Sequence, residues 1–334
     1  MAQAGEGAKV ALYKGYGWAR CRLGAARLLA VTVALALGVA AVSVRPVARV
    51  ESSSMPFNVG TVLKSVVFLY YPTDTGIEVG TGFLVELPSK VTGGEAAVVI
   101  VTARHIVDPK WAGCKIGDPT VIHARVNSKN FVLGKTSEDD AVDVVDLTLG
   151  PATDRHWFAH PNERVDVAVI PVSREHVAQF QRNDVRFVPV SDFATAAETE
   201  HYKVGIGDQI VTAGLVPALL STIRNYPAFK FARISNIPDE PIPMSCTKGD
   251  KPLPRDVWLL AGNFVGGNSG SPVYLLPPTP SAEHRVMLIG VIAGSIPDVD
   301  LGQMVPSEFV FDILQAHYPN ANLFRGHAKN TIMK

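Results

Sequence analysis

The chain has 334 residues, 47% of them apolar, so it is long enough to bury a substantial core. Its 31 basic and 31 acidic side chains balance, and the isoelectric point is near 7.1. A balanced charge gives no electrostatic basis for binding nucleic acid, so no nucleic-acid partner is expected. The 28 glycines and 24 prolines interrupt short β-branched runs, which is typical of an all-β protein with many turns.

The first 44 residues differ sharply from the rest of the chain. Residues 1–27 carry five basic side chains against a single acid, and residues 28–44 form an uncharged, apolar run. This run is at the lower length limit for a membrane-spanning helix, so a signal peptide and an uncleaved transmembrane anchor both remain open. The positive charge ahead of the run predicts a cytoplasmic N-terminus and export of the remainder. We therefore expect a periplasmic or extracellular protein, secreted or membrane-anchored through this N-terminal hydrophobic helix.

A polar, turn-rich linker is expected at 45–58, then one domain at 59–320 and a tail at 321–334. Short β-branched runs predict two sets of antiparallel strands. A short helix is expected at 175–182, a surface loop at 239–254, and a C-terminal helix at 307–317 with Ser307 as its N-cap. The predicted strands are 66–70, 82–86, 97–102, 121–126 and one opening at Asp166 in the first set, and 209–213, 229–235, 257–261, 273–276 and 286–293 in the second.

The most informative segment is the run Gly-Asn-Ser-Gly-Ser-Pro at 267–272, between two apolar stretches. Ser269, flanked by flexible residues in a turn, can present its hydroxyl to a substrate and is the candidate nucleophile. The same residue types are the commonest in ordinary turns, so a purely structural turn is the competing interpretation. A nucleophilic serine also needs a base to remove its proton and a carboxylate to orient that base.

Two residues upstream fit these roles. His105 closes a β-branched, apolar run at 96–104, where a histidine is held by rigid backbone as the strand leaves the core. Asp166 opens the run Val-Ala-Val-Ile-Pro, and an acid at the mouth of a core strand needs a partner. The structural alternatives are a satisfied strand-end histidine and a capping aspartate. The competing acids, none of which leads directly into so apolar a run, are Asp139, Asp140, Asp143, Asp146 and Asp154.

The order His105, Asp166, Ser269, in the strings Thr-Ala-Arg-His, Asp-Val-Ala-Val and Gly-Asn-Ser-Gly-Ser-Pro, resembles the trypsin-like serine peptidases, bacterial ones in particular. The resemblance covers roughly residues 59–317 and is specific at the three strings. It implies a chymotrypsin-like fold of two six-stranded antiparallel β-barrels with a C-terminal helix. It also implies a polypeptide substrate, with neither a cofactor nor a metal.

Mapped onto this chain, the resemblance implies an acyl-enzyme on Ser269. His105 would act as general base and then general acid, and Asp166 as the carboxylate that fixes the imidazole tautomer. The backbone N–H groups of Gly267 and Ser269 would form the oxyanion hole. The glycine at 267 fits, because that peptide must adopt a conformation that is costly for a residue with a Cβ.

Two departures bear on activation and specificity. Many relatives carry an aspartate directly before the nucleophile, which pairs with a new N-terminus created by cleavage, but this chain has Asn268. A site complete on folding is therefore expected. The positions that line the primary pocket in relatives correspond to Asn263, Ala293 and Ser295. With no acid at 263, a preference for Arg or Lys is unsupported, and a small or apolar P1 side chain, the one preceding the scissile bond, is expected.

Cysteines and histidines predict no further chemistry. Cys21 lies on the predicted cytoplasmic side, so Cys114 and Cys246 are the only possible exported pair, and whether they bridge stays open. His156 and His160 lie four residues apart, but the proline that follows indicates a loop and no metal-ligand spacing.

Two other functions remain open from the sequence. A catalytically inactive trypsin-like domain would act as a binding or scaffold module, because the sequence does not show whether His105 reaches the Ser269 hydroxyl. An esterase with the same triad is the second, although the Gly-x-Ser-x-Gly elbow of α/β-hydrolases is absent.

Overall fold

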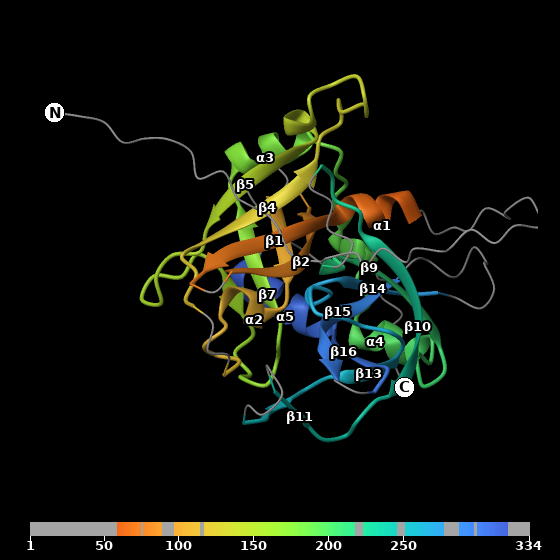
Figure 1. Ribbon diagram of the computed structural model, residues 1–334. Helices are drawn as coiled ribbons and strands as arrows, with labels where there is room; N and C mark the ends of the chain where they lie inside the picture. Colours follow the sequence, from red (N-terminus) through yellow and green to blue (C-terminus); the bar gives the residue numbers. More distant parts are fainter. Residues whose placement is uncertain are drawn as a thin grey trace, which may run out of the picture. The chain divides into compact units, whose positions relative to one another are not determined.

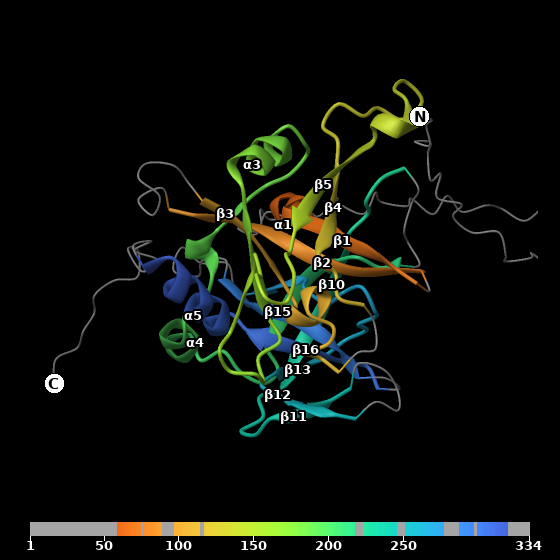
Figure 2. The same cartoon turned by 90° about the vertical axis from the view of Figure 1, so that its left-hand side faces the viewer.

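The computed structural model describes residues 59–74, 76–88, 97–113, 117–217, 223–245, 251–276, 287–296 and 299–319 (Figures 1 and 2). The predicted N-terminal hydrophobic helix, the linker, the C-terminal tail and the three cysteines lie outside these residues. Within the described ranges, no helix is long and apolar enough to span a membrane.

The first sheet has eight strands in the order β5-β4-β1-β2-β3-β7-β6, with β8 paired in parallel to β2. In β4, buried and less buried residues alternate, as expected of a strand with one face on a core. That core is aliphatic and includes Leu84, Ile100 and Ile170. The strands are β1 (Val66–Thr73), β2 (Gly76–Leu87), β3 (Ala97–Thr102), β4 (Val121–Asn127), β5 (Val142–Thr148), β6 (Phe158–Ala159), β7 (Ala168–Val172) and β8 (Val188–Pro189).

The second group of strands closes into a six-stranded antiparallel barrel in the order β10-β13-β16-β15-β14-β9. Apolar side chains such as Ile210, Ile234 and Ile289 fill it. A separate hairpin of β11 (Ile242–Met244) and β12 (Leu253–Arg255) precedes β13 in the chain. The barrel strands are β9 (Gln209–Gly214), β10 (Ala228–Asn236), β13 (Trp258–Ala261), β14 (Pro272–Leu275), β15 (Met287–Ile296) and β16 (Leu301–Pro306).

The sheet and the barrel share a hydrophobic core. Phe83 and Val99 of the sheet, Val211 and Leu288 of the barrel and Val310 of α5 belong to one cluster of buried residues. Burying such a side chain contributes about 1.5–3 kcal/mol, so each half stabilises the other. The helices are α1 (Val59–Ser65), α2 (Arg104–Val107), α3 (Arg174–Gln181), α4 (Ala196–His201) and α5 (Glu308–His317), with short 3-10 turns at Glu138–Asp140 and Val190–Asp192.

The predicted architecture is confirmed in its main lines. The fold is mostly β, one closed six-stranded barrel is present, and α3 and α5 lie within one residue of their predicted bounds. The first half differs from the predicted first barrel, because its described strands form an eight-stranded sheet whose path ends at β5 and β6. With only two residues, β6 is too short to extend the pairing.

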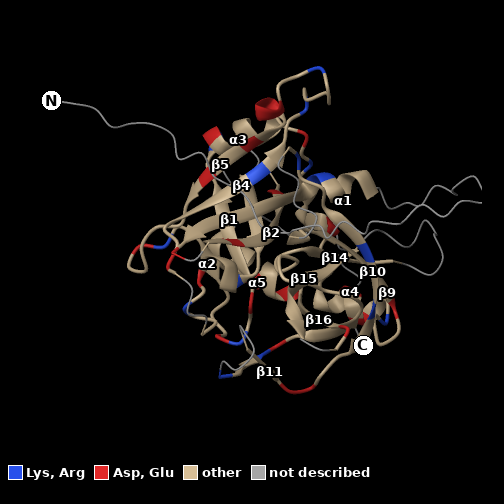
Figure 3. Ribbon diagram, viewed as in Figure 1, with Lys and Arg blue, Asp and Glu red and all other residues tan. Residues whose placement is uncertain are grey.

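Two local predictions need correction. Residues 239–254, predicted as a surface loop, contain most of the β11–β12 hairpin. Ser307 stands at the N-cap of α5, but its hydroxyl donates to the carbonyl oxygen of Ala194 at 2.7 Å and makes no cap hydrogen bond. Figure 3 shows acidic and basic residues interspersed over the visible face, in agreement with the balanced composition.

Candidate active site

Strand pairing brings His105 and Asp166 to the same end of the first sheet. β3 ends at Thr102 and β7 begins at Ala168, and these two residues are partners in the antiparallel register. After Thr102 the chain turns into α2, which contains His105, so the histidine is on a single helical turn instead of the predicted strand end. Asp166 was predicted to open its strand, but it lies two residues before β7 begins.

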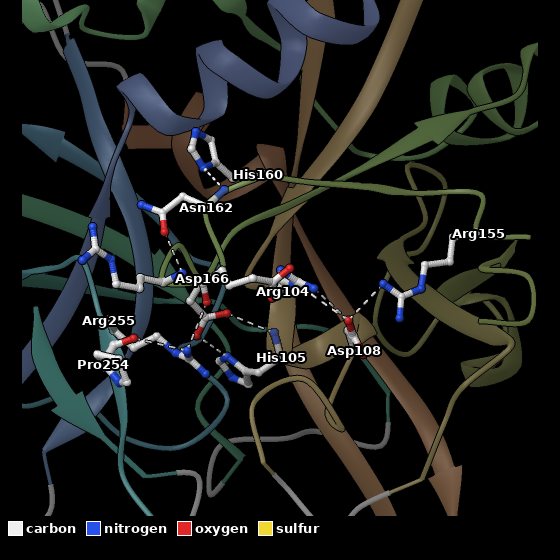
Figure 4. Close-up of polar contacts among 11 residues, drawn as sticks. Arg104, His105, Asp108, Arg155, His160, Asn162, Asp166, Pro254 and Arg255 are labelled. Carbon is white, nitrogen blue, oxygen red and sulfur yellow. Dashed lines mark hydrogen bonds and ion pairs between the residues drawn. The ribbon is translucent and has the colours of Figure 1, made fainter. Parts of the chain in front are cut away.

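His105 contacts Asp166 twice (Figure 4). Its backbone N–H donates to Oδ1 at 3.0 Å, and its ring Nδ1 lies 2.8 Å from Oδ2. Asp166 is only 3% exposed, whereas the side chain of His105 retains 20% of its exposure. An ionised carboxylate at Nδ1 favours the tautomer with the proton on that nitrogen, which leaves Nε2 able to accept a proton.

Burial and charge act in opposite directions on both groups. Burial lowers the pKa of the His105 imidazole, but the charge and hydrogen bond of Asp166 raise it, and the net pKa lies above the ordinary value. Burial raises the pKa of the Asp166 carboxyl, but the charge and hydrogen bonds of His105 lower it, and the net pKa lies below its usual range. Asp166 is therefore ionised throughout the range in which His105 titrates.

The acids that compete with Asp166 in the sequence lie elsewhere. None of them contacts His105 among the described residues, and two belong to an exposed 3-10 turn. The other three contact different partners: Asp143 with Gln179 and Asn183, Asp146 with His123, and Asp154 with His156.

The turn that contains Ser269 is hydrogen-bonded to the first sheet through Thr81 of β2. The Thr81 N–H donates to the carbonyl oxygen of Ser269 at 2.8 Å, and its hydroxyl donates to the carbonyl oxygen of Gly267 at 2.7 Å. The Thr102 hydroxyl in turn donates to the Thr81 carbonyl at 2.7 Å. The backbone at Ser269 is thus connected by two hydrogen bonds to the end of β3, three residues before His105.

The Ser269 hydroxyl itself donates to the carbonyl oxygen of Ala293 on β15, at 3.4 Å. Within the described residues no hydrogen bond joins this hydroxyl to His105. The structure therefore brings His105 and Asp166 into direct contact and fixes the Ser269 backbone, while the serine side chain points to a backbone acceptor. A long hydrogen bond of this kind costs little to break, so the hydroxyl can rotate to another acceptor.

Two glycines near Ser269 occupy positions where a side chain does not fit. Gly267 and Gly270 both have φ of +88°. A Cβ on Gly270 would lie 1.8 Å from the Thr81 carbonyl oxygen, and one on Gly267 would lie 2.9 Å from Pro217. The N–H groups of Gly267 and Ser269 donate no hydrogen bond to another described residue, so both remain able to bind a ligand oxygen.

The side chain of Asn268 forms hydrogen bonds that hold the same turn in place. It is 3% exposed, and its amide donates to the Leu215 carbonyl at 2.6 Å. Its Oδ1 accepts from the N–H of Val265 at 3.1 Å and from the amine of Lys230 at 2.8 Å. The Lys230 amine also donates to the carbonyl of Asn263 at 2.9 Å, and burial lowers its pKa. The ammonium of the partly exposed Lys230 thus contacts the residue before Ser269.

The three predicted pocket residues lie around this turn in different roles. Asn263 supplies the carbonyl that Lys230 binds, and Ala293 supplies the acceptor of the Ser269 hydroxyl. Ser295 lies on β15, two residues beyond Ala293. Sequence reasoning missed Gln303, which pairs with Gly294 across β15 and β16 and has a buried Oε1 without a hydrogen-bond partner among the described residues. An amide inside an otherwise apolar strand was the signal that could have found it.

The sequence also did not predict a charged cluster next to the His105–Asp166 pair. Arg255, at the end of β12, is 5% exposed, and its guanidinium lies 3.8 Å from the ring centroid of Trp111. Arg104, next to His105, lies 4.3 Å from the same ring and binds Asp108 and Glu163 (Figure 4). No sequence signal indicated that Arg255, which directly follows the predicted surface loop, is buried here.

The remaining histidines form no metal centre in the described part of the chain. No group of three or more His, Cys, Asp or Glu side chains there could hold a metal ion. His156 lies 3.6 Å from Asp154, and His160 lies 3.4 Å from Asp312, so the two histidines contact different acids.

No family model and no curated protein matches the sequence. The chain is similar in fold to solved proteases. The active form of the Rv3671c protease of M. tuberculosis is 16% identical with a TM-score of 0.42, over 77% of this chain and 82% of that one. The thermostable serine protease AL20, from an extremophilic microorganism, is 12% identical with a TM-score of 0.46, over 76% and 97% of the two chains. The protease Anisep of Arthrobacter nicotinovorans is 12% identical with a TM-score of 0.45, over 78% and 97%.

Proposed function

We propose that this protein is a serine endopeptidase that hydrolyses peptide bonds through an acyl-enzyme on Ser269. The observation that carries the proposal is the double contact of His105 with the buried Asp166, at 3.0 and 2.8 Å. This pair lies at the end of the first sheet to which the Ser269 turn is hydrogen-bonded. A buried carboxylate on Nδ1 is what an imidazole needs in order to take a proton at Nε2 and then carry a positive charge.

The reaction then follows from the roles of these groups. The Ser269 hydroxyl rotates from the Ala293 carbonyl toward His105, which takes its proton as Oγ attacks the substrate carbonyl carbon. The imidazolium, stabilised by Asp166, gives the proton to the leaving amine, and the C–N bond breaks. Water then attacks the acyl-enzyme with His105 again as base, which releases the acid and restores Ser269.

The oxyanion that forms in both steps is assigned to the N–H groups of Gly267 and Ser269. The positive φ at Gly267 and the absence of an acceptor for these donors among the described residues support this assignment. In other enzymes, removing one such donor costs about 3 to 4 kcal/mol of transition-state stabilisation. The hydrogen bond from Thr81 to the Gly267 carbonyl helps to hold the turn in this conformation.

A polypeptide is the proposed substrate, and export is the proposed location. A small or apolar P1 side chain is proposed because Asn263 carries no charge and Ala293 is small. The charge asymmetry of residues 1–44 supports an exported domain that is either secreted or membrane-anchored.

A second candidate function is an inactive trypsin-like domain that binds partners. The observation in its favour is the Ser269 hydroxyl, which donates to Ala293 and not to His105. The two functions differ in the reactivity of one oxygen atom, so a covalent probe separates them.

The test is labelling of the full chain with a fluorophosphonate, followed by cleavage of a peptide library. The Ser269→Ala variant should lose labelling and cleavage. Ser271→Ala is the matched control, because the Ser271 hydroxyl is buried in the same turn and has no hydrogen-bond partner in the part of the chain that the structure describes. Labelling that survives in Ser269→Ala, or a folded wild-type protein that neither labels nor cleaves, would contradict the proposed hydrolase and favour the binding module.

A further inference from the structure

The β11–β12 hairpin reaches from the second half of the chain to the segment that carries Asp166. The Arg255 guanidinium donates to the carbonyl of Glu163 at 3.3 Å, and the next N–H, of Asp256, donates to the carbonyl of Arg164 at 3.0 Å. The Asp256 carboxylate also accepts from the Asn162 amide at 2.9 Å. Residues 255–256 thus bind three consecutive residues, 162–164, which end two positions before Asp166.

The same guanidinium is also connected to the helix that carries His105. Trp111 lies between two arginines, at 3.8 Å from Arg255 and 4.3 Å from Arg104. Arg104 directly precedes His105 in α2. Arg255 therefore contacts the segment before Asp166 directly and is connected to α2 through Trp111 and Arg104. Figure 4 shows its guanidinium beside the His105–Asp166 pair.

The charge of Arg255 is less compensated than that of its neighbour. Arg104 forms ion pairs with Asp108 at 3.3 Å and with Glu163 at 3.2 Å. In the described part of the chain no carboxylate lies within ion-pair distance of Arg255, whose guanidinium donates to the backbone carbonyls of Glu163 and Pro254. A buried cation without its own counter-ion acts on the nearest titratable groups through a medium that screens poorly.

The charged groups that act on His105 are Asp166, Arg255 and Glu78, and those that act on Asp166 are His105 and Arg255. Arg255 lowers the pKa of both groups, whereas Asp166 and Glu78 raise that of His105. Arg104 and Glu163 act in turn on Arg255, with opposite signs. The positive charge of Arg255 thus disfavours the protonated, positively charged form of the His105 imidazole. It favours the ionised, negatively charged form of the Asp166 carboxylate.

We propose that Arg255 is a positioning residue for the His105–Asp166 pair, which holds the segment before Asp166 and supplies a buried positive charge that disfavours protonation of the His105 imidazole. The inference rests on the proposed hydrolase function. In the acyl-transfer cycle only the neutral imidazole can take the proton of Ser269, so the charge of Arg255 widens the pH range of activity.

The test compares Arg255→Met and Arg255→Gln, which remove the charge, with Arg255→Lys, which keeps it. The two neutral variants should move the acidic limb of kcat/KM upward by about 0.5 to 1 pH unit, because removal of a nearby cation raises the pKa of a histidine. They should also lower kcat by about tenfold with KM within about twofold, because only the pair is disturbed. Arg255→Lys should keep the limb within about 0.3 unit of wild type.

Arg233→Met is the matched control, because this exposed arginine also donates to a backbone carbonyl, of Gly207 at 2.8 Å, but lies on β10. It should leave the limb in place. Arg255→Gln carries the test if Arg255→Met does not fold, and Arg255→Lys carries it if neither neutral variant folds. The proposal would be overturned if the acidic limb of kcat/KM did not move in a folded neutral variant. It would also be overturned if Arg255→Lys raised this limb as much as is expected for loss of the charge.

A readout independent of catalysis separates this inference from the proposed function. The His105 imidazole can be titrated by NMR in the Ser269→Ala background, with and without Arg255→Gln. A higher His105 pKa in the neutral variant supports the charge of Arg255 even if the wild-type protein hydrolyses nothing. An unchanged His105 pKa overturns it even if the wild-type protein is an active peptidase.

Discussion

Thr81 donates its N–H to the carbonyl oxygen of Ser269 at 2.8 Å, so a strand of the first sheet holds the turn at the start of a barrel strand. Its hydroxyl adds two contacts, as donor to the Gly267 carbonyl at 2.7 Å and as acceptor from the Leu215 N–H at 2.9 Å. Thr81 is fully buried, so water cannot replace these hydrogen bonds when the hydroxyl is removed.

We expect Thr81→Ala to lower kcat/KM by about tenfold and the free energy of unfolding by about 1–3 kcal/mol, because two buried backbone groups lose their partner. Thr81→Ser keeps the hydroxyl and should recover most of both quantities. Kinetics and thermal unfolding of the two variants check this. Equal losses in Thr81→Ser and Thr81→Ala would show that the methyl group, and not the hydrogen bonds, matters here.

The pH dependence of activity should follow His105. Because its pKa lies above the ordinary 6.5, kcat/KM should rise with pH through a pKa higher than 6.5. Asp166→Asn removes the charge that raises this pKa, so the acidic limb should move downward as the rate falls. Asp143→Asn, which alters an acid bound to Gln179 and Asn183, should leave the limb in place. A wild-type limb at or below 6.5 contradicts this assignment.

The His105–Asp166 pair contributes to the free energy of unfolding in a pH range with an upper and a lower limit. The folded pKa of His105 is raised, so its contribution is fully present below pH 6.5 and is lost as the pH rises through the folded pKa. The folded pKa of Asp166 is lowered, so its contribution is present above pH 3.8 and is lost as the pH falls through the folded pKa. Unfolding free energies of wild type and Asp166→Asn, measured across this range, should differ most between these limits.

Lys230 should matter for rate more than for substrate binding. Lys230→Met removes the amine from the Asn268 side chain and the Asn263 carbonyl, which loosens the loop before Ser269. A loss of about tenfold in kcat is expected, since small displacements of the reacting groups are costly. The control is Lys64→Met, which removes a lysine paired with Asp184 at a more exposed site. Equal kinetics for the two variants would exclude this role of Lys230.

Gly270 should tolerate no side chain. In Gly270→Ala the new Cβ would meet the Thr81 carbonyl oxygen at 1.8 Å, so the turn must move away from the first sheet. Gly134→Ala is the matched control, since Gly134 also has a positive φ, of +74°, but has no atom within 4 Å of an added Cβ. The control should lose about 1–2 kcal/mol from backbone strain alone, and Gly270→Ala should lose clearly more, together with probe labelling. Similar unfolding free energies for the two would contradict the steric explanation.

The sequence located most of the long strands and the three motif strings, because both signals are local. Apolar runs such as 97–102 and 273–276 marked β3 and β14 to within a residue. The short helix at His105 was missed, since four residues give too little periodicity to distinguish a helical turn from a strand end. The strands β5 and β16 were missed too, and with β16 the residue Gln303.

What the sequence could not provide were contacts between distant segments. Nothing local to Arg255 indicates that it is buried on Trp111, which is 144 positions earlier in the chain. The same holds for the contact between Lys230 and Asn268. Such pairs depend on how the sheet and the barrel pack, which residue types within a window of ten or fifteen positions do not determine.

The connection through Thr81 has a consequence for the order of events during synthesis. His105 and Asp166 belong to the part of the chain made first, whereas Ser269 and the last three barrel strands are made last. β2 of the first sheet is hydrogen-bonded to the turn that contains Ser269. Arg255 and Asp256, from the later part of the chain, are hydrogen-bonded to the segment before Asp166. Neither half can finish its share of the site alone. A nascent or truncated chain should therefore be inert, and any peptidase activity should appear only when the barrel closes against the sheet.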